Sequence, residues 1–503
     1  METGTIHLPA LFLSRMETLL GDDFEAFLAS YDKPVHPSLR VNTLKLSPAR
    51  LREAAPFLGA PIPWREDGFY YSAEGDVRPG KHPLHEAGAY YIQEASAMLP
   101  ASLCPPAAGE RVLDLCAAPG GKATQLAAAL GGEGLLIANE IHPTRAAVLS
   151  QNIERMGIRN AVVTNATPAE LAERFPAFFD KIVVDAPCSG EGMFRKEADA
   201  VTMWSPENVS LCAARQAEIL DEAAKMLRVD GYLTYSTCTF APAENEGVVL
   251  AFLLRHPSFE VVPSTETAVM AAREAGLLDG GRPEWVEGYE DYPEALREAV
   301  RGAYRVLPHH CDGEGHFAVL LRKAEEGEAP TLPRRNDKSA RKKGKKGNSG
   351  KSEPSPEGTA LKLFEAFAKE TLGGIPAWAG DTTPRLFGDR LYLLPKTLSD
   401  GDPAEALRGL KVLRAGLCVG SILGLERGRG RFEPDHALAM ALPEGALTHP
   451  TDEADAAAFL RGETLPTDER GWRIVTFAGL PLGWGKGSDG VMKNHYPKGL
   501  RWN

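Results

Sequence analysis

Two cysteines lie in short segments whose residue types suit nucleophilic chemistry. Cys188 belongs to Asp185-Ala-Pro-Cys-Ser-Gly-Glu-Gly192, and Cys238 belongs to Tyr235-Ser-Thr-Cys-Thr-Phe240. A thiolate can add to C6 of a cytosine ring, which makes C5 nucleophilic enough to accept a methyl group. An acid beside the ring must hold or supply a proton at N3, and Asp185 is the candidate. The pattern therefore predicts methylation of cytosine C5 through a covalent cysteine adduct.

Spacing alone does not assign roles to the two thiols. Free cysteine is among the most buried residue types and packs as a small hydrophobe, and this is the expectation for Cys104, Cys116, Cys212, Cys311 and Cys418. Cys188 and Cys238 instead lie in loops of Ser, Thr, Pro and Gly. One of them would attack C6, and the other would help to remove the C5 proton so that the first can leave. The order stays open at this point, because DNA cytosine methyltransferases attack with the Pro-Cys cysteine.

A glycine-rich loop follows the first predicted strand of the same region. It comprises Cys116, Ala117, Ala118, Pro119, Gly120, Gly121 and Lys122. Glycine lets the backbone approach a ligand closely, and the next helix begins with unpaired N–H groups. The G-x-G-x-x-G spacing of NAD sites is missing, and Glu140 at the end of the second strand can accept hydrogen bonds from ribose hydroxyls. The combination favours S-adenosylmethionine, with Cys116 touching it through its backbone.

The elements that position these residues form an α/β pattern. Apolar runs alternate with amphipathic stretches, which predicts a doubly wound, Rossmann-like parallel sheet. The predicted strands are 111–115, 134–140, 161–164, 181–185 and 231–235, with a closing hairpin at 305–308 and 316–321. Helices are expected to begin at Pro143 and after Ser205. Since the fourth and fifth strands are neighbours in this order, both cysteines should leave adjacent strand ends on the ligand side.

Other regions flank this sheet. Residues 1–104 predict a small α+β (RRM-like) domain with two short helices, a strand at 39–43 and a helix at 90–99, and residues 105–324 predict the α/β domain. Residues 325–357 are rich in Lys, Arg, Pro, Gly and Ser and predict a basic disordered linker. Residues 358–445 and 446–503 predict two small modules, with a helix at 360–368 and strands at 390–394, 417–423 and 472–477.

Composition limits the partners and the setting. The 503 residues carry a formal charge of −12, so RNA binding would need locally basic surfaces. The basic residues expected to contact RNA are Arg195, Lys196, Lys486, Lys493, Lys498 and Arg501, with Trp484, His495, Tyr496 and Trp502 as interleaved rings. The alternative is that these basic and aromatic residues form only a solvated face and a small β core. We expect a cytoplasmic monomer with no membrane segment, and no metal at His309, His310, Cys311 and His316.

These motifs resemble the Sun/Nop family of RNA cytosine-C5 methyltransferases. The resemblance rests on residues 38–43, 93–96, 116–122, 185–196, 237–239 and 244–246. The C-terminal part, with residues 483–487 and 494–501, is similar to the bacterial RsmF branch, which modifies 16S ribosomal RNA and carries a PUA-like RNA-binding domain at 446–503.

The resemblance implies roles for individual residues. Cys238 would be the nucleophile and Cys188 the thiol that assists elimination, while the loop from Cys116 to Lys122, Glu140 and Asp185 would bind S-adenosylmethionine. One position departs from the family pattern, because Asn165 stands where an Asp commonly meets the adenine amino group. The implied partner is ribosomal RNA or the small ribosomal subunit. Transfer RNA as the substrate, or a noncatalytic ribosome-assembly factor with the same fold, are the alternatives.

Overall fold

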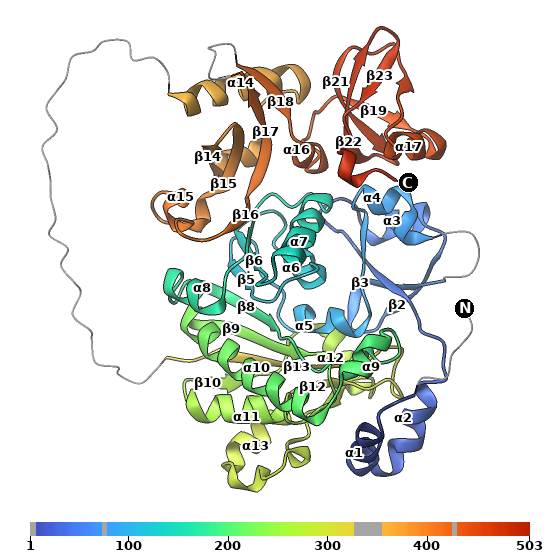
Figure 1. The fold of residues 1–503 in the computed structure, drawn as a ribbon, viewed down its shortest axis with the longest axis vertical. Coiled ribbons are helices and arrows are strands. Elements are labelled where there is room, and N and C mark those ends of the chain that lie inside the picture. The colour runs from blue at the N-terminus through green and yellow to red at the C-terminus, as the bar shows by residue number, and fades with distance from the viewer. Residues whose placement is uncertain (1–6, 73–77, 326–354, 425–429, 503) are drawn as a thin grey trace, which may run out of the picture.

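A mixed sheet of ten strands with a parallel middle forms the centre of the molecule (Figure 1). The computed structural model describes residues 7–72, 78–325, 355–424 and 430–502. The strand order is β11 (Asp279–Gly280), β12 (Tyr304–Val306), β13 (His316–Lys323), β9 (Leu227–Thr237), β8 (Phe179–Asp185), β5 (Arg111–Asp114), β6 (Leu135–Asn139), β7 (Ala161–Thr164) and β16 (Val412–Ala415), and β10 (Phe259–Val261) pairs with β13. Strands β9, β8, β5, β6 and β7 are parallel. The predicted doubly wound α/β sheet and its closing hairpin are confirmed.

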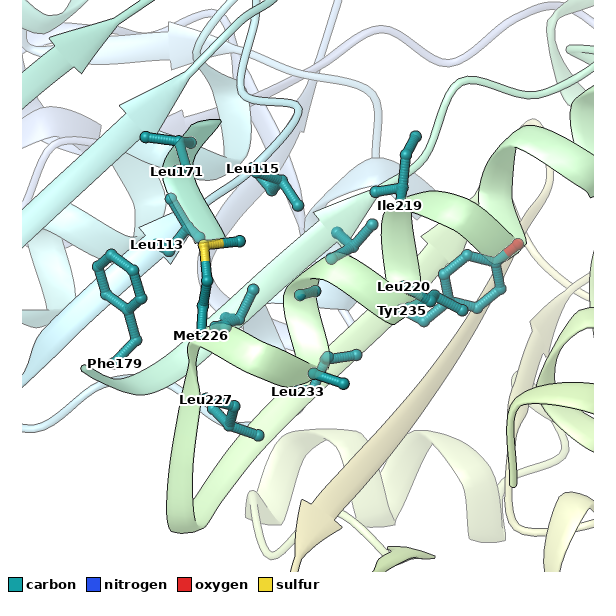
Figure 2. Close-up of a cluster of buried hydrophobic side chains, with 14 of the residues drawn as sticks. Leu113, Leu115, Leu171, Phe179, Ile219, Leu220, Met226, Leu227, Leu233 and Tyr235 are labelled. Atoms are coloured by element: carbon teal, nitrogen blue, oxygen red, sulfur yellow. The ribbon is translucent and has the colours of Figure 1, made fainter. Parts of the chain in front are cut away.

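Alternate residues of the parallel strands point into two separate cores, as the two-residue period of a strand requires. Leu113 and Ile182 belong to the core under α8 (Pro168–Arg174) and α10 (Pro206–Met226). Figure 2 shows this core, where side chains of α10 meet those of β5 and β9. Val112 and Val183 face the opposite core, under α6 (Gly121–Ala129) and α7 (Pro143–Arg155). Burial on both faces explains why these strands read as nearly continuous apolar runs.

Local signals set the starts of the covering helices. Thr167 and Glu170 form a capping box at α8, and Ser205 accepts a hydrogen bond from the backbone of Asn208 at the start of α10. Pro143 is the first residue of α7, where proline's missing N–H costs nothing. The starts predicted for α7 and α10 are confirmed.

The N-terminal module is a four-stranded antiparallel sheet preceded by two helices. The helices are α1 (Ala10–Leu20) and α2 (Phe24–Ser30), and the sheet order is β2 (Leu58–Ile62), β3 (Arg65–Tyr71), β1 (Ser38–Val41) and β4 (Tyr90–Ile92), with α3 (Pro48–Ala54) between β1 and β2. The helix predicted over 90–99 is wrong. Tyr90–Ile92 pairs with β1, and only a 3-10 turn at Ser96–Met98 and α5 (Leu99–Ser102) follow, so backbone pairing with a distant strand outweighs the local apolar pattern.

Two small β-rich modules form the C-terminal part. The first contains α14 (Pro356–Thr371) and a sheet of β14 (Thr382–Phe387), β15 (Arg390–Pro395), β17 (Leu417–Leu423) and β18 (Arg431–Pro434). The second contains α17 (Glu453–Leu460) and a sheet of β19 (Thr448–Thr451), β21 (Gly471–Phe477), β22 (Leu480–Ser488), β23 (Val491–Asn494) and β20 (Leu465–Pro466). The predicted helix and strands of this part are confirmed. Most of the predicted linker lies outside the described residues, and α14 begins inside its last two positions.

The C-terminal part attaches directly to the central sheet. Strand β16 pairs antiparallel with β7, with Val412 opposite Thr164, an extension that the strand pattern did not predict. Glu154 on α7 is hydrogen-bonded by His436 at 2.8 Å and by Arg414. Figure 1 shows these orange and red modules against α7 and α4 (Pro83–Glu86). Within the described ranges, the helices are too short or too polar for a bilayer crossing.

Candidate active site

The two cysteines of the opening motifs are in direct contact. Strands β8 and β9 are parallel neighbours with Asp185 opposite Ser236, so the loops that follow them leave the same edge of the sheet. The two sulfur atoms, Cys188 Sγ and Cys238 Sγ, lie 3.1 Å apart, and the backbone N–H of Cys238 lies 3.3 Å from Cys188 Sγ. The proximity that strand order predicted is confirmed.

The surroundings of Cys188 disfavour its thiolate form. The hydrogen bond to Cys238, together with burial and the nearby charges, raises the pKa of Cys188 well above its ordinary value. Either sulfur can be the donor in the 3.1 Å contact, and Cys188 Sγ also accepts from the Cys238 N–H. A thiolate rather than a thiol is the nucleophile, so the raised pKa disfavours attack by Cys188.

A buried carboxylate holds the Pro-Cys loop in place. Glu244 accepts hydrogen bonds from the Ser189 N–H at 3.0 Å, from the Gln216 side chain at 2.8 Å and from the Ser189 hydroxyl. The Tyr235 hydroxyl lies 3.0 Å from Gln216 Oε1. Burial raises the pKa of Glu244 to about 7, although Ser189 and Gln216 oppose the shift. From the sequence, Glu244 is recognisable only as part of the motif at 244–246, and no sequence signal points to Gln216.

The neighbouring motif residues fix the loop of Cys238. Asn245 accepts from the Thr237 hydroxyl at 2.6 Å and donates to the Thr239 carbonyl at 2.9 Å. Glu246 forms a fully buried ion pair with Arg305, whose Nε lies 2.7 Å from Glu246 Oε1. The N–H of Gly192 donates to the Cys238 carbonyl at 2.9 Å, so the two thiol loops are bonded to each other.

Asp185 is held as a carboxylate between the thiols and the glycine-rich loop. Its Oδ2 lies 2.7 Å from Lys122 Nζ, and its Oδ1 accepts from the Ser236 hydroxyl at 2.8 Å and lies 3.3 Å from His316 Nε2. Burial alone would raise the pKa of Asp185, but the charge of Lys122 and the contact with His316 hold it well below its usual range. The group is ionised at neutral pH, and His316 is a contact that sequence reasoning did not find.

A cavity of about 230 Å³ opens beside this carboxylate. The loop residues Cys116, Ala117, Ala118, Pro119, Gly121 and Lys122 line it, with Tyr91, Ile92, Gln93, Glu94, Ala97, Asp114 and Asp185. Buried Asp114 has no side-chain hydrogen-bond partner among the described residues, although the backbone of Cys116 lies beside it. Burial raises the pKa of Asp114 to about 7. Since buried polar groups are nearly always bonded, Asp114 is fitted to a ligand that donates hydrogen bonds.

Glycine is required where the loop turns toward the cavity. Gly120 has φ +119°, and a Cβ on Gly121 would lie 3.2 Å from the side chain of Gln93. The N-terminal module braces this turn: fully buried Arg40 donates to Thr124 Oγ1 at 2.8 Å and to the Gly121 carbonyl at 3.3 Å. The motif around Arg40 therefore positions the cofactor loop.

The two predicted nucleoside contacts lie outside the lining of this cavity. Glu140 is buried at the end of β6, where it accepts from the His142 N–H at 2.9 Å and lies 3.4 Å from Arg145. The amide nitrogen of Asn165 donates to the carbonyls of Glu140 and Ile141 at 2.7 and 2.8 Å. Only the side-chain oxygen of Asn165 is left to accept a hydrogen bond from an adenine amino group.

Several residues expected to contact RNA have structural partners instead. Arg195 lies 2.7 Å from Glu314 and donates to the Ser30 carbonyl at 2.6 Å, with 9% of its side chain exposed. Lys196 lies 3.9 Å from the same carboxylate. The interpretation of Arg195 as a free surface cation needs correction, because its guanidinium ties α2 to the loop before β13.

The C-terminal rings also divide into core and surface. Trp484 and Tyr496 are 1% and 3% exposed, so neither offers a stacking face, and the sequence interpretation of both is corrected. Trp484 packs against the module that precedes the last one, and Tyr496 packs against the N-terminal module. Trp472, which sequence reasoning assigned only to a strand, has Lys486 Nζ 5.0 Å from its ring centre and the His495 ring at 4.4 Å. Lys493 and Lys498 are exposed, and Arg501 is half-buried.

Comparison with known proteins covers nearly the whole chain. Residues 101–322 match the family model for the 16S rRNA methyltransferase RsmB/F, and residues 8–95, 366–442 and 446–502 match the RsmF N-terminal domain, first C-terminal domain and PUA domain. The ribosomal RNA small subunit methyltransferase F of Klebsiella pneumoniae is 34% identical over 99% of this chain and 98% of its own length. That of Shigella dysenteriae is 35% identical over the same shares.

A solved structure agrees with this relation. A methyltransferase homolog from Pyrococcus horikoshii is 28% identical, with a TM-score of 0.53 over 63% of this chain and 96% of its own.

The fold and the site define an S-adenosylmethionine-dependent RNA methyltransferase. The chain belongs to the RsmB/F family of 16S rRNA methyltransferases, and its flanking modules are those of RsmF. The family resemblance, the enzyme class and the cofactor expected from the sequence are confirmed.

Proposed function

We propose that this protein methylates C5 of a cytosine in 16S ribosomal RNA. The full-length relation to small subunit methyltransferases F supports the substrate. One observation carries the chemistry: two thiols 3.1 Å apart beside an ionised aspartate at the rim of the cofactor cavity.

Cys238 attacks and Cys188 assists in this proposal. The Cys238 thiolate bonds to C6 of the ring, which gives C5 the electron density to accept the methyl group. Once its sulfur is bonded to carbon, Cys238 carries no charge, and the main cause of the raised Cys188 pKa is gone. Cys188 can then release its own proton to water, and its thiolate accepts the C5 proton. The electrons of the broken C5–H bond re-form the C5–C6 double bond while Cys238 leaves as a thiolate.

Asp185 holds rather than supplies the ring proton. Its low pKa makes it a poor donor at neutral pH, whereas a carboxylate accepts a hydrogen bond from a protonated N3 or from the exocyclic amine. Lys122, Ser236 and His316 keep its oxygens in place. Of the two roles that the sequence allowed for Asp185, holding the N3 proton or supplying it, we therefore propose the first.

The loop from Cys116 to Lys122, Gly120 included, would hold S-adenosylmethionine together with Asp114, Glu140, Asn165 and Asp185. When bound, this cofactor supplies an electrophilic methyl group on a sulfonium. The chain's own contribution is the backbone turn at Gly120 and Gly121, the buried carboxylate of Asp114, which no side chain bonds, and the buried Glu140.

The last module supplies an RNA surface in the proposal. Trp472 and His495 offer ring faces, and Lys486, Lys493 and Lys498 offer positive charge beside them. Base stacking combined with phosphate attraction is the usual mode of single-stranded RNA contact. We assign RNA binding to residues 446–503 and methyl transfer to residues 105–324. Residues 1–104 brace the cofactor loop, and residues 358–445 join the modules. In this proposal the protein acts as a monomer.

The test uses purified full-length protein with labelled methyl donor. We expect transfer to 16S rRNA, free or in the small subunit, at a single cytosine. C238S should abolish transfer without an adduct, and C188A should accumulate a covalent RNA–protein species on denaturing gels, while Cys418→Ala, in β17 of another module, serves as the control. If C188A abolished transfer and C238S accumulated the adduct, the roles of the two cysteines would be exchanged. Preferred methylation of transfer RNA would identify that RNA as the substrate instead. Absence of transfer to any RNA would support a noncatalytic ribosome-assembly factor. Analytical sedimentation tests whether the protein is a monomer.

A further inference from the structure

Three side chains outside the thiol pair and the cofactor cavity bring metal-ligating atoms together. Asp23, His309 and His310 each offer one ligand atom, and these atoms lie within 4.8 Å of one another. Asp23 ends the 3-10 turn η1 (Gly21–Asp23) between α1 and α2, and the histidines lie in the loop between β12 and β13. From the sequence, no metal is expected in this hairpin because of the placement of its candidate ligands, whereas the tertiary structure brings Asp23 to two of them.

His309 is prepared for a ligand. Both of its ring nitrogens are buried, and neither has a hydrogen-bond partner within residues 7–72, 78–325, 355–424 and 430–502. Its ring lies against Phe27 at 5.8 Å and His310 at 4.0 Å between centres. Because nearly all buried polar groups are satisfied in folded proteins, an imidazole with two idle nitrogens marks a place where a cation would supply the missing bond.

His310 is oriented by a second carboxylate. Its Nδ1 lies 2.7 Å from Asp279 Oδ2, on β11, which leaves Nε2 as the nitrogen free to coordinate. A histidine ligand usually donates its other ring N–H to a carboxylate, which fixes the tautomer and raises the basicity of the coordinating nitrogen. Asp279 in turn lies 3.6 Å from Arg282.

We propose that Asp23, His309 and His310 bind one zinc-type divalent transition metal ion, with Asp279 as the orienting partner of His310. Two imidazoles and one carboxylate are a zinc ligand set that leaves a fourth position for water, whereas magnesium and calcium prefer oxygen ligands alone. The ion would tie the α1–α2 hairpin, dark blue at the lower edge of Figure 1, to the edge of the central sheet. This inference does not depend on the proposed substrate.

Zinc titration of the metal-free full-length protein, followed by calorimetry, tests the site. We expect one Zn²⁺ per chain and a rise in the thermal midpoint. His309→Ala and Asp23→Asn should lose this binding, and Asp279→Asn should weaken it by about 10- to 100-fold, as removal of an orienting carboxylate does elsewhere. His449→Ala is the matched control, because His449 pairs with Glu469 at 2.7 Å in a different module.

Cobalt substitution separates this site from the thiol pair. Co²⁺ bound by histidine and carboxylate shows d–d bands without the sulfur-to-cobalt charge-transfer band that cysteine ligands produce. Circular dichroism of Asp23→Asn, an exposed position, shows whether loss of binding occurs in folded protein. The proposal is overturned if the unaltered protein binds no zinc, if Asp23→Asn and His309→Ala bind it with unchanged affinity, or if the cobalt spectrum shows sulfur ligation.

Discussion

Replacing Glu244 with glutamine should flatten the pH dependence of folding stability between pH 4.5 and about 7. The carboxyl is fully buried, and its pKa rises from 4.5 to about 7 mainly because of burial. In this window the folded chain keeps a proton that the unfolded chain has lost, so stability falls as pH rises. A pKa difference of one between the folded and unfolded states corresponds to about 1.4 kcal/mol, so complete ionisation of Glu244 lowers the free energy of unfolding by about 3 kcal/mol.

Comparison of the unaltered protein with E244Q isolates the contribution of Glu244 to the pH dependence of stability. Glutamine keeps an oxygen to accept from the Ser189 N–H and the Gln216 amide and does not ionise. Urea unfolding of both proteins at pH 4.5 and pH 8 should show a loss of stability that is about 3 kcal/mol larger in the unaltered protein. Other titrating groups are common to both proteins and cancel in this difference.

Two further variants make the result specific. Glu244→Ala removes the acceptor of two buried N–H donors, so it should cost about 1–3 kcal/mol for each of them at either pH. Glu463→Gln, at a side chain that is 54% exposed, controls for the added amide. Equal pH dependence in the unaltered protein and in E244Q would refute the assignment of a raised pKa to this buried group.

Three other measurements probe the site and its supports. Arg305→Met leaves Glu246 buried without its partner and should cost about 3–5 kcal/mol in urea unfolding; a loss below 1 kcal/mol would argue that the pair is dispensable. Lys122→Met removes the cation beside Asp185, so the pKa of Asp185 should rise and the acid limb of the kcat/KM profile should move to higher pH; an unmoved limb would show that Asp185 does not control it. Trp472→Ala should weaken RNA binding by about 1–3 kcal/mol and leave the cofactor affinity unchanged, whereas Lys493→Ala should lower the slope of affinity against salt by about 1. Unchanged RNA affinity in both variants would place the RNA surface elsewhere.

Much of the α/β domain was predictable because its signals are local. Strands buried on both faces read as apolar runs, and proline and serine mark the starts of α7 and α10. The order of the strands then placed Cys188 and Cys238 side by side, as the 3.1 Å contact confirms. The one wrong element, at 90–99, failed because pairing with β1 is a contact between distant segments.

The supports of the site were less accessible from sequence. Gln216 lies on α10 and Arg305 on β12, and nothing near either residue in the sequence indicates that they bond Glu244 and Glu246. The rings of the last module could be recognised as a group, but the pattern could not separate the buried ring of Tyr496 from the half-buried ring of Trp472.

The residue types of this chain by themselves indicated its class of chemistry: two thiols, an acid and a glycine-rich turn at the ends of predicted strands are enough to predict a covalent methyl transfer. Only the folded structure decided which groups are ionised, which cations are already paired, and which distant side chains meet. Asp185 is kept charged by Lys122, Arg195 is neutralised by Glu314, and Asp23 joins His309 and His310. The physical reason is that burial and charge pairing depend on neighbours in space, whereas a sequence shows only neighbours along the chain.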